Sequence, residues 1–141
     1  MKSFHEYVKE GTMKRISPDI QRAKSLQLEA ERKLHSLKEK IGKVGIRDDN
    51  ANDYVEYCYD IIMVLIRAVL YTKGYSSGGA GAHEAEVSYL LDFGFSENEV
   101  DFADKLRYFR NGILYYGKRF DKDYALRVIA YTKRVNSKII F

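Results

Sequence analysis

The chain of 141 residues is poor in the residues that build disulfides, metal centres and sharp backbone breaks: it has one cysteine, one proline and three histidines, and no tryptophan. The single cysteine, Cys58, excludes an intramolecular disulfide and a zinc site made of cysteines. The histidines lie in separate segments and match neither H-x-x-x-H nor C-x-x-C spacing, so we expect no metal and no other cofactor. This composition predicts a protein of the reducing cytoplasm.

The sequence also has no apolar run of the length that a membrane span or a secretory signal requires. Its most apolar stretch, Ile61 to Ile66, is bounded by Asp60 and Arg67. The first residues, MKSFHE, are mostly polar. We therefore expect neither a membrane-spanning nor a targeting segment.

Strand signals are equally scarce, because no run alternates apolar and polar residues between hairpin turns. Apolar residues recur instead at spacings of three and four, and the length suits one domain. We predict an all-α fold, a single-domain bundle of five or six helices over residues 1–141. The expected helices are a short one within 1–14, then 17–42, a central apolar one over 50–73, 82–91, 96–117 and a last one from Asp121 or Lys122, with a flexible glycine-rich loop over 74–81.

Local signals mark the start of two of these helices. Ser17 and Pro18 suit the cap and the first helical position, where the missing N–H of proline is not needed. Ser96 and Glu99 form a capping-box pattern. The helix that Ser96 opens is expected to bury one stripe of side chains at alternating four- and three-residue spacing: Phe102, Leu106, Phe109, Ile113 and Tyr116. Ala125, Val128, Ile129 and Thr132 are expected to face inward on the last helix.

Charge is divided unevenly along the chain. Residues 84–104 hold seven acidic and no basic residues, whereas residues 105–141 hold ten basic and two acidic residues. A basic segment attracts polyanions such as RNA. The acidic segment can equally pair with it within the chain or across a dimer, so both interpretations stay open.

Two patterns at the glycine-rich loop give only weak evidence for a phosphate-binding or acid–base site. The loop precedes a helix, as phosphate-binding loops do, but it lacks the lysine of G-x-x-x-x-G-K-[ST] and no strand precedes it. His83 and Glu84 follow, but adjacent helical residues point about 100° apart. An ordinary loop and a surface or capping histidine are favoured.

The most specific segment is LRYFRNGILYYGK, residues 106–118. In a continuous helix Arg110 lies about 80° from the centre of the core stripe, on the side of Ala103, Arg107, Leu114 and Gly117. Such a guanidinium binds either a phosphate or a carboxylate at a dimer contact. Tyr115 and Tyr116 either stack on bases or lie at the rim of the core.

With these residues the sequence resembles prokaryotic HEPN domains, helical bundles that are often encoded beside minimal nucleotidyltransferases. The resemblance covers residues 53–131, with KGY at 73–75, HEA at 83–85, LRYFRN at 106–111 and YYGK at 115–118. Catalytically active relatives are metal-independent RNases. Their motif is an arginine, usually followed by a polar residue, and then a histidine after four to six intervening positions. Arg110 and Asn111 match the first two residues.

The histidine of that motif is absent, because Tyr115, Tyr116 and Gly117 stand at its possible positions. A tyrosine with a pKa near 10 binds phosphate but is a poor proton shuttle at neutral pH. The resemblance thus implies a degenerate catalytic motif of Arg110, Asn111, Tyr115 and Tyr116. In active relatives two protomers share one cleft, so it also implies a homodimer.

Three functions follow as hypotheses. The first is a non-catalytic homodimer that binds RNA or a nucleotide, or that serves as partner of a minimal nucleotidyltransferase in a toxin–antitoxin-like pair. The second is a metal-independent endoribonuclease that uses Arg110 with Tyr115 or Tyr116, and the third is an interaction scaffold without a nucleic-acid role. The first is favoured, because the missing histidine is the group whose pKa the reaction requires. The expected phosphate-binding residues are Arg107, Arg110, Lys118 and Arg119.

Overall fold

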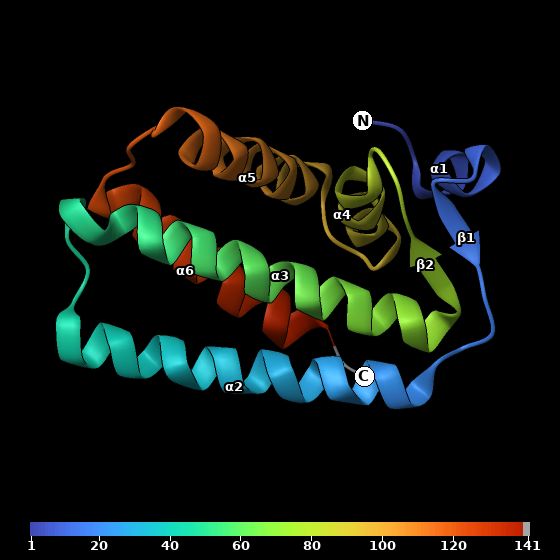
Figure 1. Ribbon diagram of the computed structural model, residues 1–141, viewed down its shortest axis with the longest axis horizontal. Coiled ribbons are helices and arrows are strands. Elements are labelled where there is room, and N and C mark those ends of the chain that lie inside the picture. Colours follow the sequence, from blue (N-terminus) through green and yellow to red (C-terminus); the bar gives the residue numbers. More distant parts are fainter. Residues whose placement is uncertain (140–141) are drawn as a thin grey trace.

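The computed structural model describes residues 1–139, and residues 140 and 141 of the expected domain lie outside the described part (Figure 1). The described residues form a helical bundle, which confirms the predicted all-α fold. Its elements, in chain order, are α1 (Phe4–Glu10), β1 (Met13–Arg15), α2 (Ile20–Val44), the 3-10 turn η1 (Asp48–Asn50), α3 (Ala51–Lys73), β2 (Tyr75–Ser77), α4 (Ala82–Asp92), α5 (Glu97–Tyr116) and α6 (Lys122–Lys138).

Helix α3 is the centre of the bundle, as its apolar sequence predicts. It contacts α2, α4, α5 and α6, and Figure 1 shows α2 on one side of it, α4 and α5 on the other, and α6 behind. Ile61, Ile62 and Leu65 are fully buried although successive helical residues point in different directions. Each such side chain stabilises the fold by about 1.5–3 kcal/mol. Most of the core is therefore organised around this one helix.

The start of α2 differs from the prediction. Ser17 and Pro18 precede the helix, and Asp19 is the cap, its carboxylate accepting from the N–H of Arg22 at 3.0 Å. The reason is tertiary: the N–H of Ile16 donates to the carbonyl of Gly74, which holds the preceding residues extended beside the end of α3. The helix also continues past the predicted end at residue 42 and stops at Val44.

A second difference from the prediction is the strand pair β1–β2, which no sequence pattern predicted. Met13–Arg15 runs antiparallel to Tyr75–Ser77, with Lys14 opposite Ser76. The predicted N-terminal helix is thus limited to Phe4–Glu10, and part of the predicted glycine-rich loop is strand. The two strands are far apart in sequence and only three residues long, so neither hairpin turn nor alternation marks them.

The predictions for α5 and α6 are largely confirmed. Ser96 and Glu99 form the capping box, and the four inward residues predicted on α6 are all buried. Leu106 is fully buried, and Phe102 and Ile113 are partly buried against the core. Phe109 is half-buried beside Phe120 and Tyr124. Tyr116 was expected in this stripe, but it is 88% exposed. The last turn of α5 extends beyond its neighbours, and Gly117 in left-handed conformation then turns the chain back towards α6.

Within residues 1–139, none of the helices combines the length and the apolar character that a membrane span requires.

Candidate functional site

Three of the expected site residues, Arg107, Arg110 and Asn111, lie near other polar side chains where the start of α4 meets α5 and α3. An open hollow of about 310 Å³ lies there. Its lining comes from the glycine-rich loop, the first turn of α4 and the middle of α5: Gly79, Gly81, Ala82, His83, Glu84, Arg107 and Asn111. We call this hollow, together with the adjoining Tyr59, Asp60, Arg67, Glu86 and Arg110, the α3–α4–α5 groove.

Arg110 projects from α5 towards α3, and its side chain is only 26% exposed. The centre of its guanidinium lies 5.4 Å from the ring centroid of Tyr59, and Nη2 donates to Oδ1 of Asp60 at 3.4 Å. Its Nε is buried and finds no acceptor among the described residues. A buried donor without a partner costs about 1–3 kcal/mol. Arg110 is therefore held in place by an aromatic ring and a carboxylate, and its buried Nε donor has no partner within the described chain.

Arg107 lies one turn earlier on α5 and is enclosed by carboxylates. Its Nε donates to Oδ1 of Asp104 at 3.1 Å, and its Nη2 lies 3.6 Å from Oε1 of Glu84. The Glu84 contact joins α5 to α4. The positive charge of Arg107 is thus largely compensated within the chain, and an incoming phosphate competes with two carboxylates for it.

A chain of polar contacts crosses the groove from α3 to α4. Arg67 donates from Nε to Oε2 of the buried Glu86 at 2.6 Å, and its Nη2 lies 3.3 Å from Nε2 of His83. A guanidinium only donates, so we assign Nε2 as the acceptor and place the proton of His83 on Nδ1. Nδ1 lies 3.1 Å from the hydroxyl of Tyr59. His83 is thereby held through both ring nitrogens.

Burial raises the pKa of Tyr59 to about 12. Its hydroxyl therefore stays protonated at neutral pH and accepts from Nδ1 of His83, while its ring supports the guanidinium of Arg110. Tyr59 therefore positions His83 and Arg110 in the groove and does not serve as a general base.

Sequence reasoning missed the α3 residues of the groove. Asp60 and Arg67 are the only charged residues between Tyr57 and Thr72, and seven residues place them on the same face of a helix. Two charges that interrupt an apolar helix on one face were the available signal. Tyr59 offered no comparable signal, because a buried tyrosine on a central helix is ordinary.

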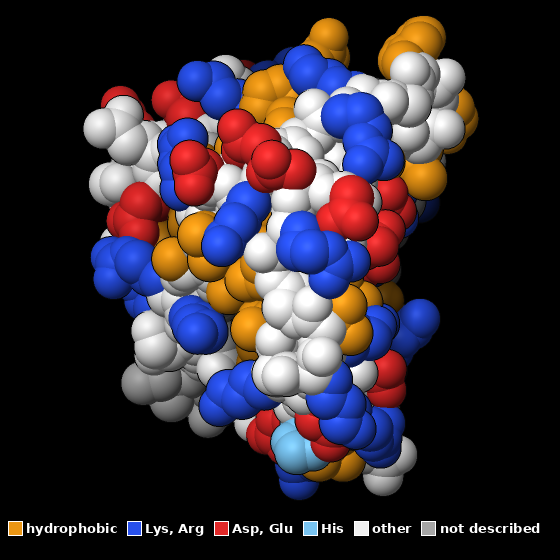
Figure 2. Space-filling model, turned by 90° about the vertical axis from the view of Figure 1, so that its left-hand side faces the viewer, with side chains coloured by type: hydrophobic (Ala, Val, Ile, Leu, Met, Phe, Trp, Pro, Cys, Tyr) orange, Lys and Arg blue, Asp and Glu red, His pale blue; other side chains and the backbone are white. Residues whose placement is uncertain are grey.

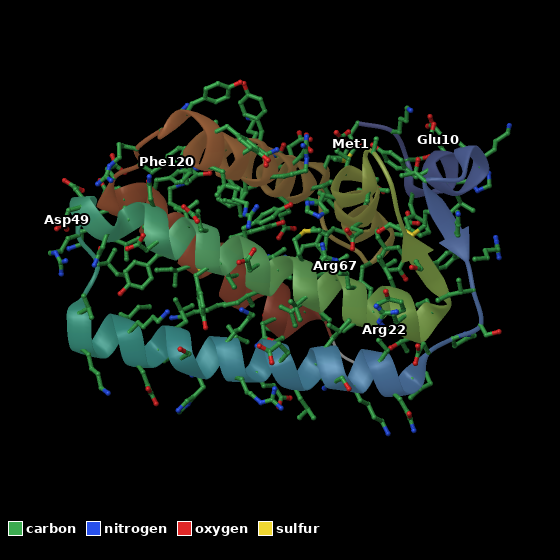
Figure 3. The ribbon with its side chains drawn as sticks, viewed as in Figure 1. Met1, Glu10, Arg22, Asp49, Arg67 and Phe120 are labelled. Atoms are coloured by element: carbon green, nitrogen blue, oxygen red, sulfur yellow. The ribbon has the colours of Figure 1, made fainter. Side chains whose placement is uncertain are left out.

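Tyr115 and Tyr116, the other members of the expected motif, do not lie beside Arg110. Five and six residues turn a helix by about 140° and 240°, so both rings point away from the groove. They are 76% and 88% exposed, and Figure 3 shows aromatic side chains extending from the C-terminal end of α5 away from the rest of the molecule. Asn111 is exposed and lines the hollow with Arg107.

Lys118 and Arg119 lie after α5, at the end of the molecule that carries the α2–α3 and α5–α6 connections. Nζ of Lys118 is 4.8 Å from the ring centroid of Phe109, and Nη2 of Arg119 donates to the carbonyl of Asp49 at 3.1 Å. Figure 2 shows basic side chains spread over this end, with acidic ones among them. The four expected phosphate-binding residues thus form two groups, one in the groove and one at this end.

The acidic and basic segments pair in part within the chain. Arg107 contacts Glu84 and Asp104, and Arg134 of α6 donates to Glu99 of α5. The bond from Arg134, helped by the N–H of Ser96, lowers the pKa of Glu99 to about 2. No salt bridge within residues 1–139 involves Lys105, Lys118 or Arg119.

No group of three or more His, Cys, Asp or Glu in the described part of the chain is arranged to hold a metal ion. Comparison of the chain with protein-family models, with curated proteins and with solved structures found no match.

Proposed function

We propose that this chain is a homodimeric, HEPN-like binding module that holds the phosphates of RNA or of a nucleotide at Arg110 and does not cleave RNA. The observation that carries the proposal is the setting of Arg110: stacked on Tyr59, paired with Asp60, and left with a buried Nε that has no acceptor within the described chain. A guanidinium fixed in this way is ready to bind an oxyanion, because little side-chain freedom remains to be lost.

The neighbours of Arg110 extend this site. Asn111 and Arg107 line the adjoining hollow, so they can contact the same phosphate or the next one along a strand. Lys118 and Arg119 lie further away and contribute attraction for a polyanion rather than direct positioning.

The RNase alternative is less well supported by the groove. Cleavage without a metal requires a group that takes the proton of the 2′-hydroxyl. Tyr115 and Tyr116 point away from Arg110, and Tyr59 stays protonated because its pKa is about 12. His83 is close, but its Nε2 accepts from Arg67. These side chains suit binding better than proton transfer.

The scaffold alternative relies on the acidic and basic segments as association surfaces. Their pairs with Arg107 and Arg134 already lie within one chain, which leaves less of the acidic charge for a partner. The resemblance to HEPN domains adds a specific partner to the first proposal, a minimal nucleotidyltransferase in a toxin–antitoxin-like pair. A reading frame for such an enzyme beside this gene supports that extension.

The decisive test is the binding of fluorescein-labelled RNA, measured by anisotropy at low salt. We expect Arg110→Ala to weaken binding by about tenfold, which corresponds to about 1.4 kcal/mol for a lost charge-assisted contact. Added salt should weaken binding by the wild type further. The matched control is Arg32→Ala, because Arg32 is an exposed arginine of α2 that pairs only with Glu29.

Two outcomes count against this proposal. If the wild type retains neither RNA nor nucleotide at low salt, the scaffold function takes its place. If the wild type cleaves RNA in the presence of EDTA and Arg110→Ala does not, the endoribonuclease becomes the better description.

A further inference from the structure

The exposed tyrosines of this protein are concentrated on one short surface. Of the 12 tyrosines, only Tyr108, Tyr115 and Tyr116 are exposed, at 66%, 76% and 88%, and the other nine are buried or half-buried. All three lie on the C-terminal half of α5. Exposing three large rings within nine residues leaves apolar area in water, which points to a partner that covers it.

The positions of the three tyrosines on α5 bring their rings close together on the surface. Tyr108 and Tyr115 are seven residues apart, so both lie on the face opposite the core-facing Leu106, about 10 Å apart along the axis. Tyr116 follows Tyr115 at the last turn and points about 100° from it, so it borders the face of Tyr108 and Tyr115. This outer face, which we call the tyrosine platform, is distinct from the α3–α4–α5 groove, which lies on the inner side of the same helix.

Cations outnumber carboxylates near the C-terminal end of the platform, whereas Asp104 and Asp101 lie beside its other end, one and two turns before Tyr108. Residues 105–120 contain five cations and no carboxylate, and within the described chain Lys105, Lys118 and Arg119 form no salt bridge. Rings interleaved with cations are the arrangement with which proteins hold unpaired nucleotides, because bases stack on aromatic faces while the phosphates lie near the positive charge.

A second copy of the chain fits this face less well. In a two-fold contact the same surface meets itself, so Lys105, Lys118 and Arg119 would be brought close to their own counterparts. Arg107 and Arg110 differ, because carboxylates of the same chain compensate them. A polyanion complements the platform, whereas a copy of the chain would repel it.

We infer that the tyrosine platform binds single-stranded RNA by stacking its bases on Tyr108, Tyr115 and Tyr116, with its phosphates near Lys118 and Arg119. This inference rests on the proposed RNA binding and specifies its substrate as unpaired RNA. Duplex RNA is excluded from the platform, because its bases are stacked on one another and offer no free face.

The test compares labelled oligouridine with an RNA duplex of equal length, again by anisotropy. We expect Tyr115→Ala and Tyr116→Ala each to weaken oligouridine binding by about tenfold, as losses of single base–aromatic stacks do. Tyr115→Phe and Tyr116→Phe keep the ring and should bind like the wild type. Because the chain has no tryptophan, its own emission comes from tyrosine, and oligouridine should quench it less in the double phenylalanine variant.

The control substitution is Leu28→Ala, which removes an apolar side chain that is 51% exposed on α2. If the alanine variants bind oligouridine as the wild type does while Arg110→Ala binds more weakly, the platform inference fails and the proposed function stands. If the alanine variants lose the dimer without losing RNA affinity, the face is a contact between copies and the inference is overturned. If the wild type binds no RNA at all, both proposals fall.

Discussion

Among single residues, Arg67 contributes both to the candidate binding groove and to the stability of the fold. Arg67 neutralises Glu86, whose side chain is only 3% exposed, and at the same time holds Nε2 of His83. A buried carboxylate with a partner adds little net stability, but the same carboxylate without its partner is strongly destabilising. Arg67 therefore lies in the groove for a reason that is independent of any ligand.

We expect Arg67→Met to lower the free energy of unfolding by about 3 kcal/mol, because it leaves Glu86 charged and unpaired in the core. Urea denaturation followed by circular dichroism measures this loss. The double variant Arg67→Met/Glu86→Leu removes both charges and should recover much of it. A double variant no more stable than Arg67→Met would show that the pair itself, rather than the unpaired charge, determines the loss.

At the scale of elements, the junction between α3 and β2 depends on a glycine. Gly74 has a φ of 86°, and a Cβ at this position would lie 2.7 Å from the carbonyl oxygen of Ile16. The close approach lets the segment before α2 bond to the end of α3. One residue thus allows the strand pair and the start of α2 to lie where they do.

The same substitution should have opposite effects at two glycines. Gly74→Ala is expected to destabilise the protein by at least about 1–2 kcal/mol, because alanine is strained in the left-handed region and its Cβ meets the backbone of Ile16. Gly42→Ala lies within α2, where nothing approaches within 4 Å, and should stabilise by about 0.5–1 kcal/mol. Thermal unfolding measures both shifts. Equal shifts in one direction would contradict the described geometry.

At the scale of the whole molecule, α5 has two sides that the bundle leaves open. The tyrosine platform lies beside Lys118 and Arg119, which form no salt bridge within the described chain, whereas the side of Leu114 adjoins arginines that are already paired. Leu114 is 50% exposed. The Leu114 side therefore suits a contact with a second copy, and the platform suits RNA.

Light scattering should accordingly give twice the chain mass of 16.4 kDa at micromolar concentration. We expect Leu114→Asp to return the protein to a monomer, because it places two charges in a two-fold apolar contact. Leu28→Asp is the matched control, since Leu28 is equally exposed but lies on α2. A monomeric wild type, or a dimer that both variants preserve, would rule out this contact.

Local signals in the sequence are enough to predict most of the helices. Apolar spacing and capping residues act within four or five positions of one another, so the bounds of α3 and α5, the start of α6 and the capping box of Ser96 could be predicted. Arg110 and Asn111 were singled out by the resemblance of their segment to the HEPN motif. Signals of this kind are local, so they do not depend on how the helices pack against one another.

Which side chains meet depends on how the helices pack against one another. The pairing of β1 with β2, the shift of the α2 cap to Asp19 and the exposure of Tyr116 each depend on the neighbours that an element finds in the bundle. So does the groove, where Tyr59 and His83 come from different helices. The physical reason is that packing and pairing join residues distant in sequence, and no short-range periodicity records which distant residues these are.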